Sequence, residues 1–499
     1  MKHSKKIASL FLALVMALAL AVPAFADETY SITINNSTEG HTYEAYQIFT
    51  GDLYDGTLSN IEWGSGVSEA GKTALGDAAA KAETIKTADD AAAFAKKVAG
   101  YLGTVAGSAS TVTGGKYVIS GLAAGYYLIK DQEGSLTGDH DSYTSYILEV
   151  VKDVDVDPKN TGTPEVVKKV QDINDSMNSS ITDNAWQDSA DHDIGDKVPF
   201  QLTATLADNV SSYTTYKVVF HDTLSKGLTY NNDAKVTFNS TDVTSSFTIT
   251  SAVNADGITT LTISCDNVKD LGAGNSSVIT VEYTATLNEN AIIGSAGNPN
   301  KVYLEYSNNP HNSTETGKTP EDTVIVFTYK TIINKVTKNP DYDPEVEGSK
   351  EYIPLTGAEF TLQKKQADGT YKDIAVVKNA EGTTFTFSGL DDGEYKLVET
   401  TTPSGYNDID DIEFEIIATH TNGDTPVLKD LNGNKLSGEI TFASNTADGS
   451  LSANVINNKG AELPSTGGMG TTIFYVVGSI LVLAAVVLLV TKKRMSGEK

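Results

Sequence analysis

Lysine and cysteine decide which covalent chemistry this sequence can support. The chain has 499 residues, and Arg494 is its only arginine, so almost every cationic side chain is a lysine. Of these two basic side chains, only lysine readily loses its proton inside a protein and acts as an amine nucleophile. Cys265 is the only cysteine, so no disulfide can form within one chain. Any covalent staple inside a domain must therefore be made from other side chains.

The residues for other kinds of catalysis are poorly represented. The seven histidines and Cys265 are not grouped at the spacing of metal ligands or of a catalytic triad, and the sequence contains no glycine-rich phosphate loop. Acidic stretches such as 408–411 do not by themselves predict bound calcium. We therefore predict no enzyme activity, no cofactor and no metal site.

The last stretch of the chain combines three features in a fixed order. The pentapeptide Leu463-Pro464-Ser465-Thr466-Gly467 comes first, residues 471–490 are twenty residues without a charge, and Lys492-Lys493-Arg494 follow. At about 1.5 Å per residue, this apolar segment is long enough to cross a bilayer core of about 30 Å. The basic cluster is expected to stay on the cytoplasmic side and to halt export.

This arrangement resembles the cell-wall sorting signal of Gram-positive surface proteins. In that family, the cysteine of a sortase attacks the bond that corresponds here to Thr466–Gly467, and passes the threonyl carbonyl to an amine. The resemblance implies a class C pilin sortase, a housekeeping sortase and peptidoglycan as partners. It also implies a secreted protein that is covalently anchored to the wall and whose precursor is transiently held in the membrane, with 461–499 as the sorting signal.

The first residues predict the same destination. Lys2, Lys5 and Lys6 form a basic region, residues 7–22 are apolar, and Ala24-Phe25-Ala26 is typical of a signal peptidase site. Residues 1–26 are therefore predicted to be a signal peptide and are left out of the fold. Between the two processing sites the chain has 30 lysines and 64 acidic residues, a net charge of −34. Such an acidic body argues against nucleic acid or anionic lipid as a partner.

The rest of the sequence is typical of antiparallel β-sandwiches. Short alternating segments rich in Thr, Val, Ile and Tyr are separated by Asn, Asp and Gly. We expect a mainly β protein with tandem immunoglobulin-like sandwiches at 27–160, 161–328 and 329–460. The first domain should contain helices, because 78–102 is rich in alanine and Thr87-x-x-Asp90 matches a capping box.

The junction after the first domain resembles the pilin motif of Gram-positive shaft pilins, Val-Tyr-Pro-Lys-Asn. Here the stretch reads Val156-Asp157-Pro158-Lys159-Asn160, with Asp157 in the place of tyrosine. In the family, the amine of this lysine attacks the sortase-bound threonine of the next subunit. The resemblance therefore assigns Lys159 as the intersubunit acceptor, and other copies of the chain as partners. Tip and basal minor pilins are further partners that it allows.

Three stretches of the middle domain resemble the isopeptide-bearing domain of such pilins. They are the first strand with Lys168 and Lys169, an apolar run that ends at Asp222, and an expected last strand that begins near Asn300. In the family, a first-strand lysine bonds to a last-strand asparagine beside an acid. The resemblance implies Lys168, Asn300 and the promoting acid Asp222. Lys169 remains an alternative amine, because alternation turns only one of the two lysines inward.

The third domain carries a sharper version of the same pattern. The segment from Tyr395 to Tyr406 resembles the E-box of collagen-adhesin B-type domains and shaft pilins, with its acid at Glu399. Lys335 lies on the expected first strand, and Asn457 on the last. The resemblance implies a Lys335–Asn457 bond promoted by Glu399, with Asn458 as a weaker alternative to Asn457.

An internal repeat extends this comparison to the first domain. Gly389-Leu390-x-x-Gly393-x-Tyr395-x-Leu397 matches Gly121-Leu122-x-x-Gly125-x-Tyr127-x-Ile129, which aligns Asp131 with Glu399. Residues 27–71 contain no lysine, so the first strand offers no amine, and we predict no isopeptide bond there.

The expected chemistry depends on burial. Burial lowers the pKa of a lysine and raises that of a carboxyl, by up to about 3–5 units. A buried pair can then exchange a proton, after which the neutral amine attacks the asparagine carbonyl and ammonia leaves. The alternative interpretation of each set of three residues is a lysine–carboxylate salt bridge that lies beside an asparagine. Taken together, the resemblances predict the shaft subunit of a covalent pilus that supports adhesion, and the alternative is a monomeric wall-anchored adhesin or a minor pilin.

Overall fold

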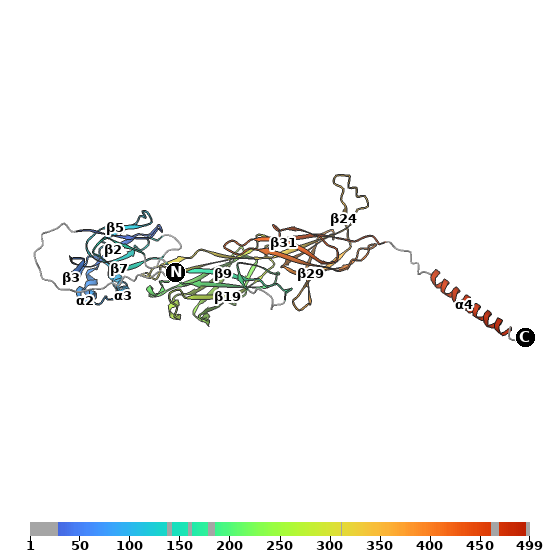
Figure 1. Ribbon diagram of the computed structural model, residues 1–499, viewed down its shortest axis with the longest axis horizontal. Helices are drawn as coiled ribbons and strands as arrows, with labels where there is room; N and C mark the ends of the chain where they lie inside the picture. Colours follow the sequence, from blue (N-terminus) through green and yellow to red (C-terminus); the bar gives the residue numbers. More distant parts are fainter. Residues whose placement is uncertain are drawn as a thin grey trace.

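The computed structural model describes residues 28–136, 142–157, 162–177, 185–310, 312–460 and 469–495. The expected mainly β architecture is confirmed: its sheets fall into three groups that follow one another along the long axis of the molecule (Figure 1). Each group encloses hydrophobic core of its own. We propose 27–160, 161–328 and 329–460 as the boundaries of the first, middle and third domains that carry these sheets.

The first domain contains two sheets. The smaller one holds β5 (Tyr117–Leu122), β1 (Tyr30–Ile34) and β8 (Val154–Val156). The larger one holds β3 (Thr57–Trp63), β2 (Tyr43–Tyr54), β6 (Gly125–Asp131) and β7 (Ser145–Val150), with β4 (Gly107–Ala109) paired to β2. Residues at alternate positions of these strands, such as Ile32 and Ile34, form the core between the sheets.

Short helices cover the larger sheet of the first domain. They are α1 (Glu69–Leu75), α2 (Ala78–Ala82), α3 (Ala88–Val98) and the 3₁₀ turn η1 (Ala99–Tyr101). The predicted capping box is confirmed: Thr87 accepts from the backbone of Asp90, and the Asp90 carboxylate accepts from the backbone of Thr87. The ring of Phe94 stacks on that of Phe49 in β2 with 5.6 Å between centroids, so α3 shares a core with the sheet.

The middle domain is a sandwich of two seven-stranded sheets. One has the order β10 (Trp186–Gln187), β9 (Glu165–Gln171), β12 (Lys197–Thr205), β19 (Val278–Leu287), β15 (Lys235–Phe238) and β16 (Thr241–Asp242), with β14 (Leu228–Tyr230) on β19. The other has the order β11 (Ser189–Asp191), β22 (Asp322–Phe327), β20 (Asn298–Ser307), β13 (Val218–Leu224), β18 (Thr259–Cys265) and β17 (Thr248–Val253), with β21 (Thr316–Lys318) on β20. The 3₁₀ turns are η2 (Val210–Ser212), η3 (Thr244–Ser246) and η4 (Val268–Leu271).

The third domain is a sandwich of a six-stranded and a five-stranded sheet. The first has the order β27 (Val376–Lys378), β28 (Thr384–Leu390), β23 (Tyr329–Lys338), β33 (Ser450–Ile456) and β32 (Phe442–Asn445), with β24 (Tyr352–Pro354) on β23. The second has the order β26 (Tyr371–Ile374), β25 (Glu359–Lys365), β29 (Gly393–Thr401), β30 (Ile412–His420) and β31 (Leu428–Ser437). The segment before β24 projects from the side of the domain (Figure 1).

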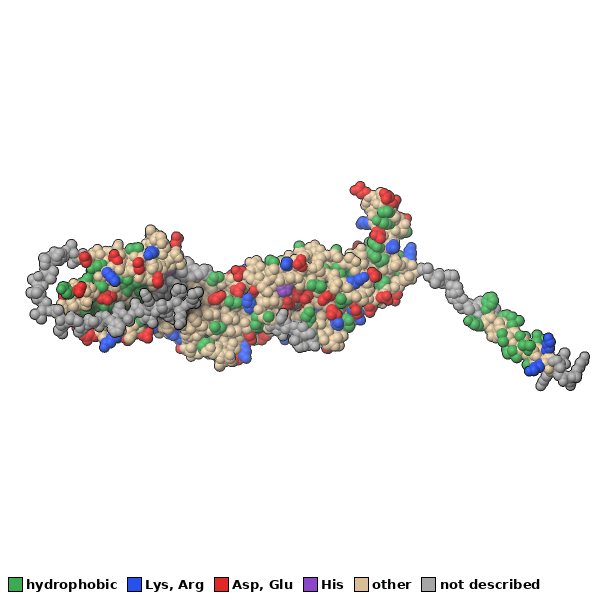
Figure 2. All heavy atoms as spheres, in the orientation of Figure 1, with side chains coloured by type: hydrophobic (Ala, Val, Ile, Leu, Met, Phe, Trp, Pro, Cys, Tyr) green, Lys and Arg blue, Asp and Glu red, His purple; other side chains and the backbone are tan. Residues whose placement is uncertain are grey.

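The C-terminal helix α4 spans Met469–Met495. Its segment 474–493 is long and apolar enough to cross a membrane, and its large side chains are exposed, as Figure 2 shows. The predicted apolar helix after the pentapeptide is therefore confirmed.

Candidate cross-linking sites

Lys168, Asp222 and Asn300 lie together in the interior of the middle sandwich. Lys168 comes from β9 in one sheet, whereas Asp222 on β13 and Asn300 on β20 face it from the other. In the β13–β20 ladder, Asp222 pairs with Val302 and Leu224 pairs with Asn300, so the acid and the amide occupy neighbouring positions on one face. All three side chains are fully buried. The alternation of the strands therefore converges three polar groups in an apolar core.

Tyr283 joins these three side chains. The Lys168 amine donates to Asp222 Oδ1 at 2.6 Å and to the Tyr283 hydroxyl at 3.1 Å. That hydroxyl donates to Asp222 Oδ2 and accepts from Asn300 Nδ2 at 2.7 Å. Asn300 Oδ1 is buried and accepts no hydrogen bond from the residues that the structure describes. Tyr283 was not predicted, because its position in an alternating strand is that of an ordinary core aromatic residue.

The surroundings of Lys168 favour its neutral form. Its Nζ lies 5.4 Å from the ring centroids of both Phe200 and Tyr283. Burial lowers the pKa of Lys168, although Asp222 opposes this effect. The neighbouring Lys169 instead pairs with Asp188 in a partly exposed site. The sequence allowed either Lys168 or Lys169 as the reacting amine, and only Lys168 faces the interior.

One expectation about this domain is wrong. Asn300 does not lie on the last strand, because β21 and β22 follow β20. The expectation followed the family resemblance, and it overlooked both the three-residue β21 and the six-residue β22. β20 pairs with β22, and the register sets Asn300 opposite Val324. Asn300 therefore lies next to the strand that leads into the third domain.

Lys335, Glu399 and Asn457 meet in the interior of the third sandwich. Lys335 on β23 and Asn457, just after β33, lie side by side because these two strands are parallel neighbours. Glu399 reaches them from β29 in the facing sheet. Here Asn457 does follow the last strand of the domain, whereas its neighbour Asn458 is exposed. The first and last strands therefore bring their reactive groups to one point.

A single carboxylate contacts both reacting groups of the third domain. Glu399 Oε1 lies 2.7 Å from the Lys335 amine, and Glu399 Oε2 accepts from Asn457 Nδ2 at 3.0 Å. The amine also donates to Asn457 Oδ1, and Asn457 Nδ2 donates to the carbonyl of Asn407 at 2.9 Å. Burial lowers the pKa of Lys335, against the opposing effect of Glu399. Its Nζ lies 5.2 Å from the ring centroid of Phe360.

Two predicted sites lie outside the described residues. These are the acceptor Lys159 and the pentapeptide Leu463, Pro464, Ser465, Thr466 and Gly467. The structure describes the chain up to Asp157, whose carboxylate accepts from Asn35 Nδ2 at 2.9 Å.

Comparisons with known proteins match three parts of the chain. Residues 194–310 match a family described as Gram-positive pilin backbone subunit 2, Cna-B-like domain. Residues 347–432 match a prealbumin-like fold domain, and residues 456–496 match the LPXTG cell wall anchor motif.

Two similar proteins come from Streptococcus pyogenes serotype M6. The trypsin-resistant surface T6 protein is 25% identical over 401 residues, which cover 66% of this chain and 69% of that protein. The solved structure of the T6 backbone pilin superposes with a TM-score of 0.56 at 20% identity, and the match covers 88% of this chain and all of that one. Together, the pilin-backbone domain, the anchor motif and the similarity to T6 support an LPXTG-anchored backbone pilin of Gram-positive bacteria. It is a cell-wall-anchored surface protein that is membrane-held as a precursor.

The first domain of this pilin repeats the geometry of the third with different chemistry. The Tyr127 hydroxyl donates to the carbonyl of Ala123 at 2.8 Å, and the Tyr395 hydroxyl donates to that of Asp391 at 3.0 Å. Asp131 is buried like Glu399, but its carboxylate contacts His41 Nδ1 at 2.7 Å instead of a lysine. An imidazole in this position cannot form a stable amide with a carboxamide.

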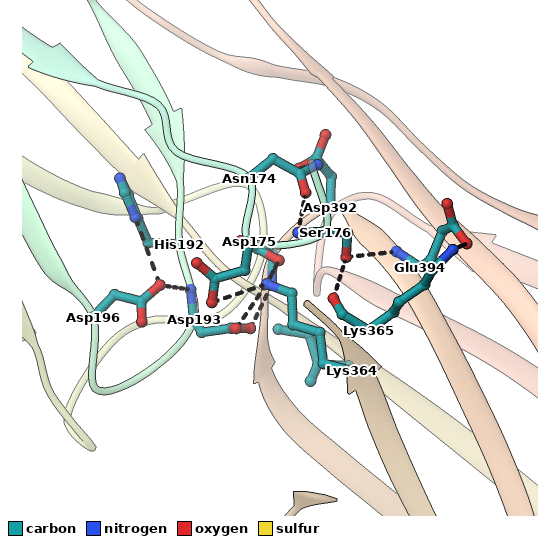
Figure 3. A network of polar contacts seen from close by, with 12 residues as sticks. Asn174, Asp175, Ser176, His192, Asp193, Asp196, Lys364, Lys365, Asp392 and Glu394 are labelled. Atoms are coloured by element: carbon teal, nitrogen blue, oxygen red, sulfur yellow. Dashed lines mark hydrogen bonds and ion pairs between the residues drawn. The ribbon is translucent and has the colours of Figure 1, made fainter. Parts of the chain in front are cut away.

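The junction between the middle and third domains of this pilin holds a dense polar network that the sequence did not reveal. The buried Lys364 amine, on β25, donates to Asp193 Oδ2 of the middle domain at 2.7 Å and also to Asp391 (Figure 3). Ser176 donates to the carbonyl of Lys365 at 2.8 Å and accepts from the backbone of Glu394 at 3.0 Å. In the sequence, Lys364 and Lys365 read only as charged residues of an alternating strand.

Proposed function

We propose that this pilin is the shaft subunit of a covalent surface pilus. A sortase cleaves Thr466–Gly467 and transfers the threonyl carbonyl to Lys159 of the next copy. Because one chain carries both a donor end and an acceptor, head-to-tail repetition gives an open filament. The proposal rests on one observation: the middle and third sandwiches each bury a lysine, an acid and an asparagine. In the third domain the three groups contact one another directly, and in the middle domain the Tyr283 hydroxyl connects the asparagine to the other two.

The chemistry of each cluster is a single-turnover amide exchange. The acid takes a proton from the lysine amine, so that both groups become neutral in the buried site. The amine then attacks Cγ of the asparagine while the protonated acid donates to its carbonyl oxygen. The amide nitrogen leaves as ammonia, and the acid keeps the proton that it took from the lysine until ammonia or solvent removes it. The products are one Lys168–Asn300 bond in the middle domain and one Lys335–Asn457 bond in the third.

Such bonds suit a filament under tension. Load that enters at Lys159 and leaves at Thr466 would pass from Lys168 directly to Asn300, and from Lys335 directly to Asn457. The strands between each pair of linked residues would then carry no load. The strands and helices of the first domain all precede Lys159 in the chain, so they lie outside the load path and need no cross-link.

The pilus proposal is tested on wall material released by a muralytic enzyme and run on a denaturing gel. The wild type should give a ladder of high mass, and Lys159→Ala should collapse it to monomer. Lys152→Ala is the matched control, because Lys152 is an exposed lysine seven positions earlier in the sequence. A single monomer band from the wild type would overturn the proposal and leave a wall-anchored adhesin or minor pilin. A ladder that survives Lys159→Ala would move the acceptor to another lysine.

The cross-links are tested separately by the intact mass of the purified chain. Each bond lowers the mass by one ammonia, so the wild type should lack two. Glu399→Gln should restore one ammonia and Asp222→Asn the other, and the double variant should have the full mass. A wild type of full mass would refute both bonds without bearing on the sortase reaction.

A further inference from the structure

Three potential metal ligands meet at the junction of the middle and third domains. Asp172 follows β9, Asp191 ends β11, and His420 ends β30 of the third domain. One ligand atom of each lies within 4.8 Å of the other two. The cluster is separate from both cross-linking sites and draws its ligands from two domains. The network of Figure 3 lies in the same junction.

The distance between two of these ligands suits a shared ion. His420 Nε2 lies 3.4 Å from Asp172 Oδ2, which is long for a direct N–H···O hydrogen bond. Two ligands bound tetrahedrally to one Zn²⁺ at about 2.0–2.2 Å are separated by about 3.4 Å. The side chains of His420 and Asp172 are largely buried, so the gap between them is sheltered from bulk water.

The hydrogen bonds around His420 leave the nitrogen that faces Asp172 without a proton when the ring is neutral. The Ser189 hydroxyl has one proton, which it donates to the carbonyl of Thr421 at 2.9 Å. Its contact with His420 Nδ1, at 2.6 Å, must therefore be donated by the ring. A neutral His420 then presents the lone pair of Nε2 to the Asp172 carboxylate. A cation between these two acceptors would stabilise the pair, and a partner at the other ring nitrogen is usual for a metal-bound histidine.

Asp191 adds a buried carboxylate with one unsatisfied oxygen atom. Its exposed fraction is 2%, and its Oδ2 accepts no hydrogen bond from any described residue. No ion pair to Asp191 occurs in the described part of the chain, because the Lys364 amine is engaged by Asp193 and Asp391. Asp172 Oδ1 is likewise buried without a hydrogen-bond partner among the described residues, so each of the two carboxylates has an oxygen available to a ligand.

We propose that Asp172, Asp191 and His420 bind one divalent transition-metal ion, with Zn²⁺ as the best fit. Imidazole nitrogen and carboxylate oxygen are both zinc ligands, and three protein ligands leave a fourth position for water. The ion would join the middle domain to the third and balance the buried carboxylates. A second acidic cluster nearby, Asp175, Asp193 and Asp196, needs no metal because the Lys364 amine already contacts Asp193 and lies 3.8 Å from Asp175.

The loop that carries His420 is itself fixed to the middle domain. Gly423 donates its backbone N–H to Asp188 Oδ2 at 2.8 Å, and the backbone of Asp188 donates to Asn422 Oδ1 at 2.9 Å. The ring of His420 also packs against Phe327 with 5.8 Å between centroids. The histidine is therefore held in place without the metal, so the site is formed in advance and binding costs little reorganisation.

The test is calorimetric titration of metal-stripped mature pilin with ZnCl₂, with CaCl₂ and MgCl₂ in parallel runs. The wild type should bind one Zn²⁺ per chain, and Zn²⁺ should raise its melting temperature by mass action. His420→Gln and Asp172→Asn should abolish the tight site. Ser189→Ala, which removes only the partner of His420 Nδ1, should weaken it by about tenfold or more. Asp175→Asn is the matched control in the neighbouring cluster and should bind Zn²⁺ as the wild type does.

Three results would overturn the proposal. The first is the absence of saturable Zn²⁺ binding by the wild type, a result that does not require any variant to fold. The second is equal loss of Zn²⁺ binding in Asp175→Asn and Asp172→Asn, which would move the ion to the other cluster. The third is a preference for Ca²⁺ over Zn²⁺, which would contradict a role for the imidazole.

Discussion

Burial distinguishes the reactive lysines of this pilin from its other lysines. Lys168 and Lys169 are adjacent in the chain, yet one is fully buried beside Asp222 and the other forms a partly exposed ion pair with Asp188. A solvated ammonium is not a nucleophile, whereas burial lowers the pKa of Lys168 and makes its neutral form accessible. The local alternation of a strand therefore decides which amine can react.

Tyr283 should be required for fast bond formation in the middle domain. Its hydroxyl is the group that contacts Lys168, Asp222 and Asn300 together, so it can pass a proton between them. A proton-transfer group of this kind typically contributes about 10²–10⁴-fold in rate. We expect freshly purified Tyr283→Phe to retain one ammonia in its intact mass, with the third-domain bond unaffected.

Tyr230→Phe is the control for that experiment. The ring of Tyr230 packs edge-on against that of Tyr283 with 5.6 Å between centroids, but its hydroxyl accepts from the backbone of Ala234. Loss of this hydroxyl should leave the bond complete. If the intact mass of freshly purified Tyr283→Phe is already lower by two ammonia molecules, both bonds have formed, and a proton-transfer role for Tyr283 is excluded.

A middle domain without its cross-link should become more stable as the pH rises. Asn300→Ala leaves the Lys168 amine buried beside Asp222 and Tyr283, with Asp322 on its backbone. Because burial holds the pKa of Lys168 below its ordinary value of 10.5, the unfolded chain binds more protons than the folded one between these two values. Stability therefore rises with pH in this window, up to about pH 10.5, and the gain is lost as the pH falls toward the folded pKa.

Chemical denaturation at several pH values, with Asn300→Ala compared to Lys168→Met/Asn300→Ala, isolates the contribution of this amine. The two variants should converge in stability toward high pH. The wild type has no free amine at this site if the bond has formed, so it should lack this dependence. A gap between the two variants that stays constant from neutral pH to pH 10.5 would contradict a lowered pKa.

At the scale of elements, the first and third domains share a turn, which comes before β6 in one and before β29 in the other. In the third domain, this turn also contacts the middle domain. Gly121 and Gly389 occupy the same place in the repeat, with φ of 76° and 78°. A Cβ on Gly121 would meet nothing within 4 Å, whereas one on Gly389 would lie 2.8 Å from Cβ of Ile194 in the middle domain. The third-domain turn is therefore also an interdomain contact, and the backbone of Ile194 donates to the Gly389 carbonyl at 3.0 Å.

Gly389→Ala should loosen the domain junction, whereas Gly121→Ala should not. Both substitutions place a side chain in the left-handed region at a cost of about 1–2 kcal/mol. Only Gly389→Ala adds a steric cost of about 1–3 kcal/mol, because Ile194 must move. Hydrogen exchange followed by mass spectrometry should show faster exchange around residues 193–195 in Gly389→Ala alone. Equal exchange at this segment in both variants would show that the contact does not hold the junction.

The elements that sequence could predict are those with local patterns. Alternation predicted the sandwiches, and it restricted the amine to one of Lys168 and Lys169. The capping box at Thr87 predicted the start of α3. By contrast, Tyr283 acquires its role from partners 61 and 115 positions away, and the ligands of the junction come from separate strands. No local pattern marks such contacts. Asn300 was expected on the last strand because the family places its asparagine there, whereas in this chain β22 follows and pairs with β20.

At the scale of the whole molecule, the position of Asn300 before β22 determines which part of the shaft can lengthen under tension. The expected bonds span 168–300 and 335–457, so the residues between them, including β22, remain in the load path. Non-covalent contacts must hold that segment against tension. β22 pairs with β20 and with β11, and Asp322 accepts a hydrogen bond from the backbone N–H of Lys168. The charged junction around Lys364 and Asp193 lies beside the same connection. The polar network therefore reinforces the part of the shaft that the covalent bonds leave out.

Single-molecule pulling between residues 159 and 466 should reveal this division. In the wild type, extension should stop once the unlinked segments are straight, because covalent bonds bypass both sandwiches. Lys335→Met removes the third-domain link, whose ends are 122 positions apart in sequence, and should add one unfolding event. At about 3.3–3.6 Å per residue, that event should lengthen the chain by on the order of 400 Å. Lys338→Met is the control, because Lys338 is an exposed lysine on the same strand, and its trace should match the wild type. The same long event in the wild type would mean that the third domain carries no covalent link between its first and last strands.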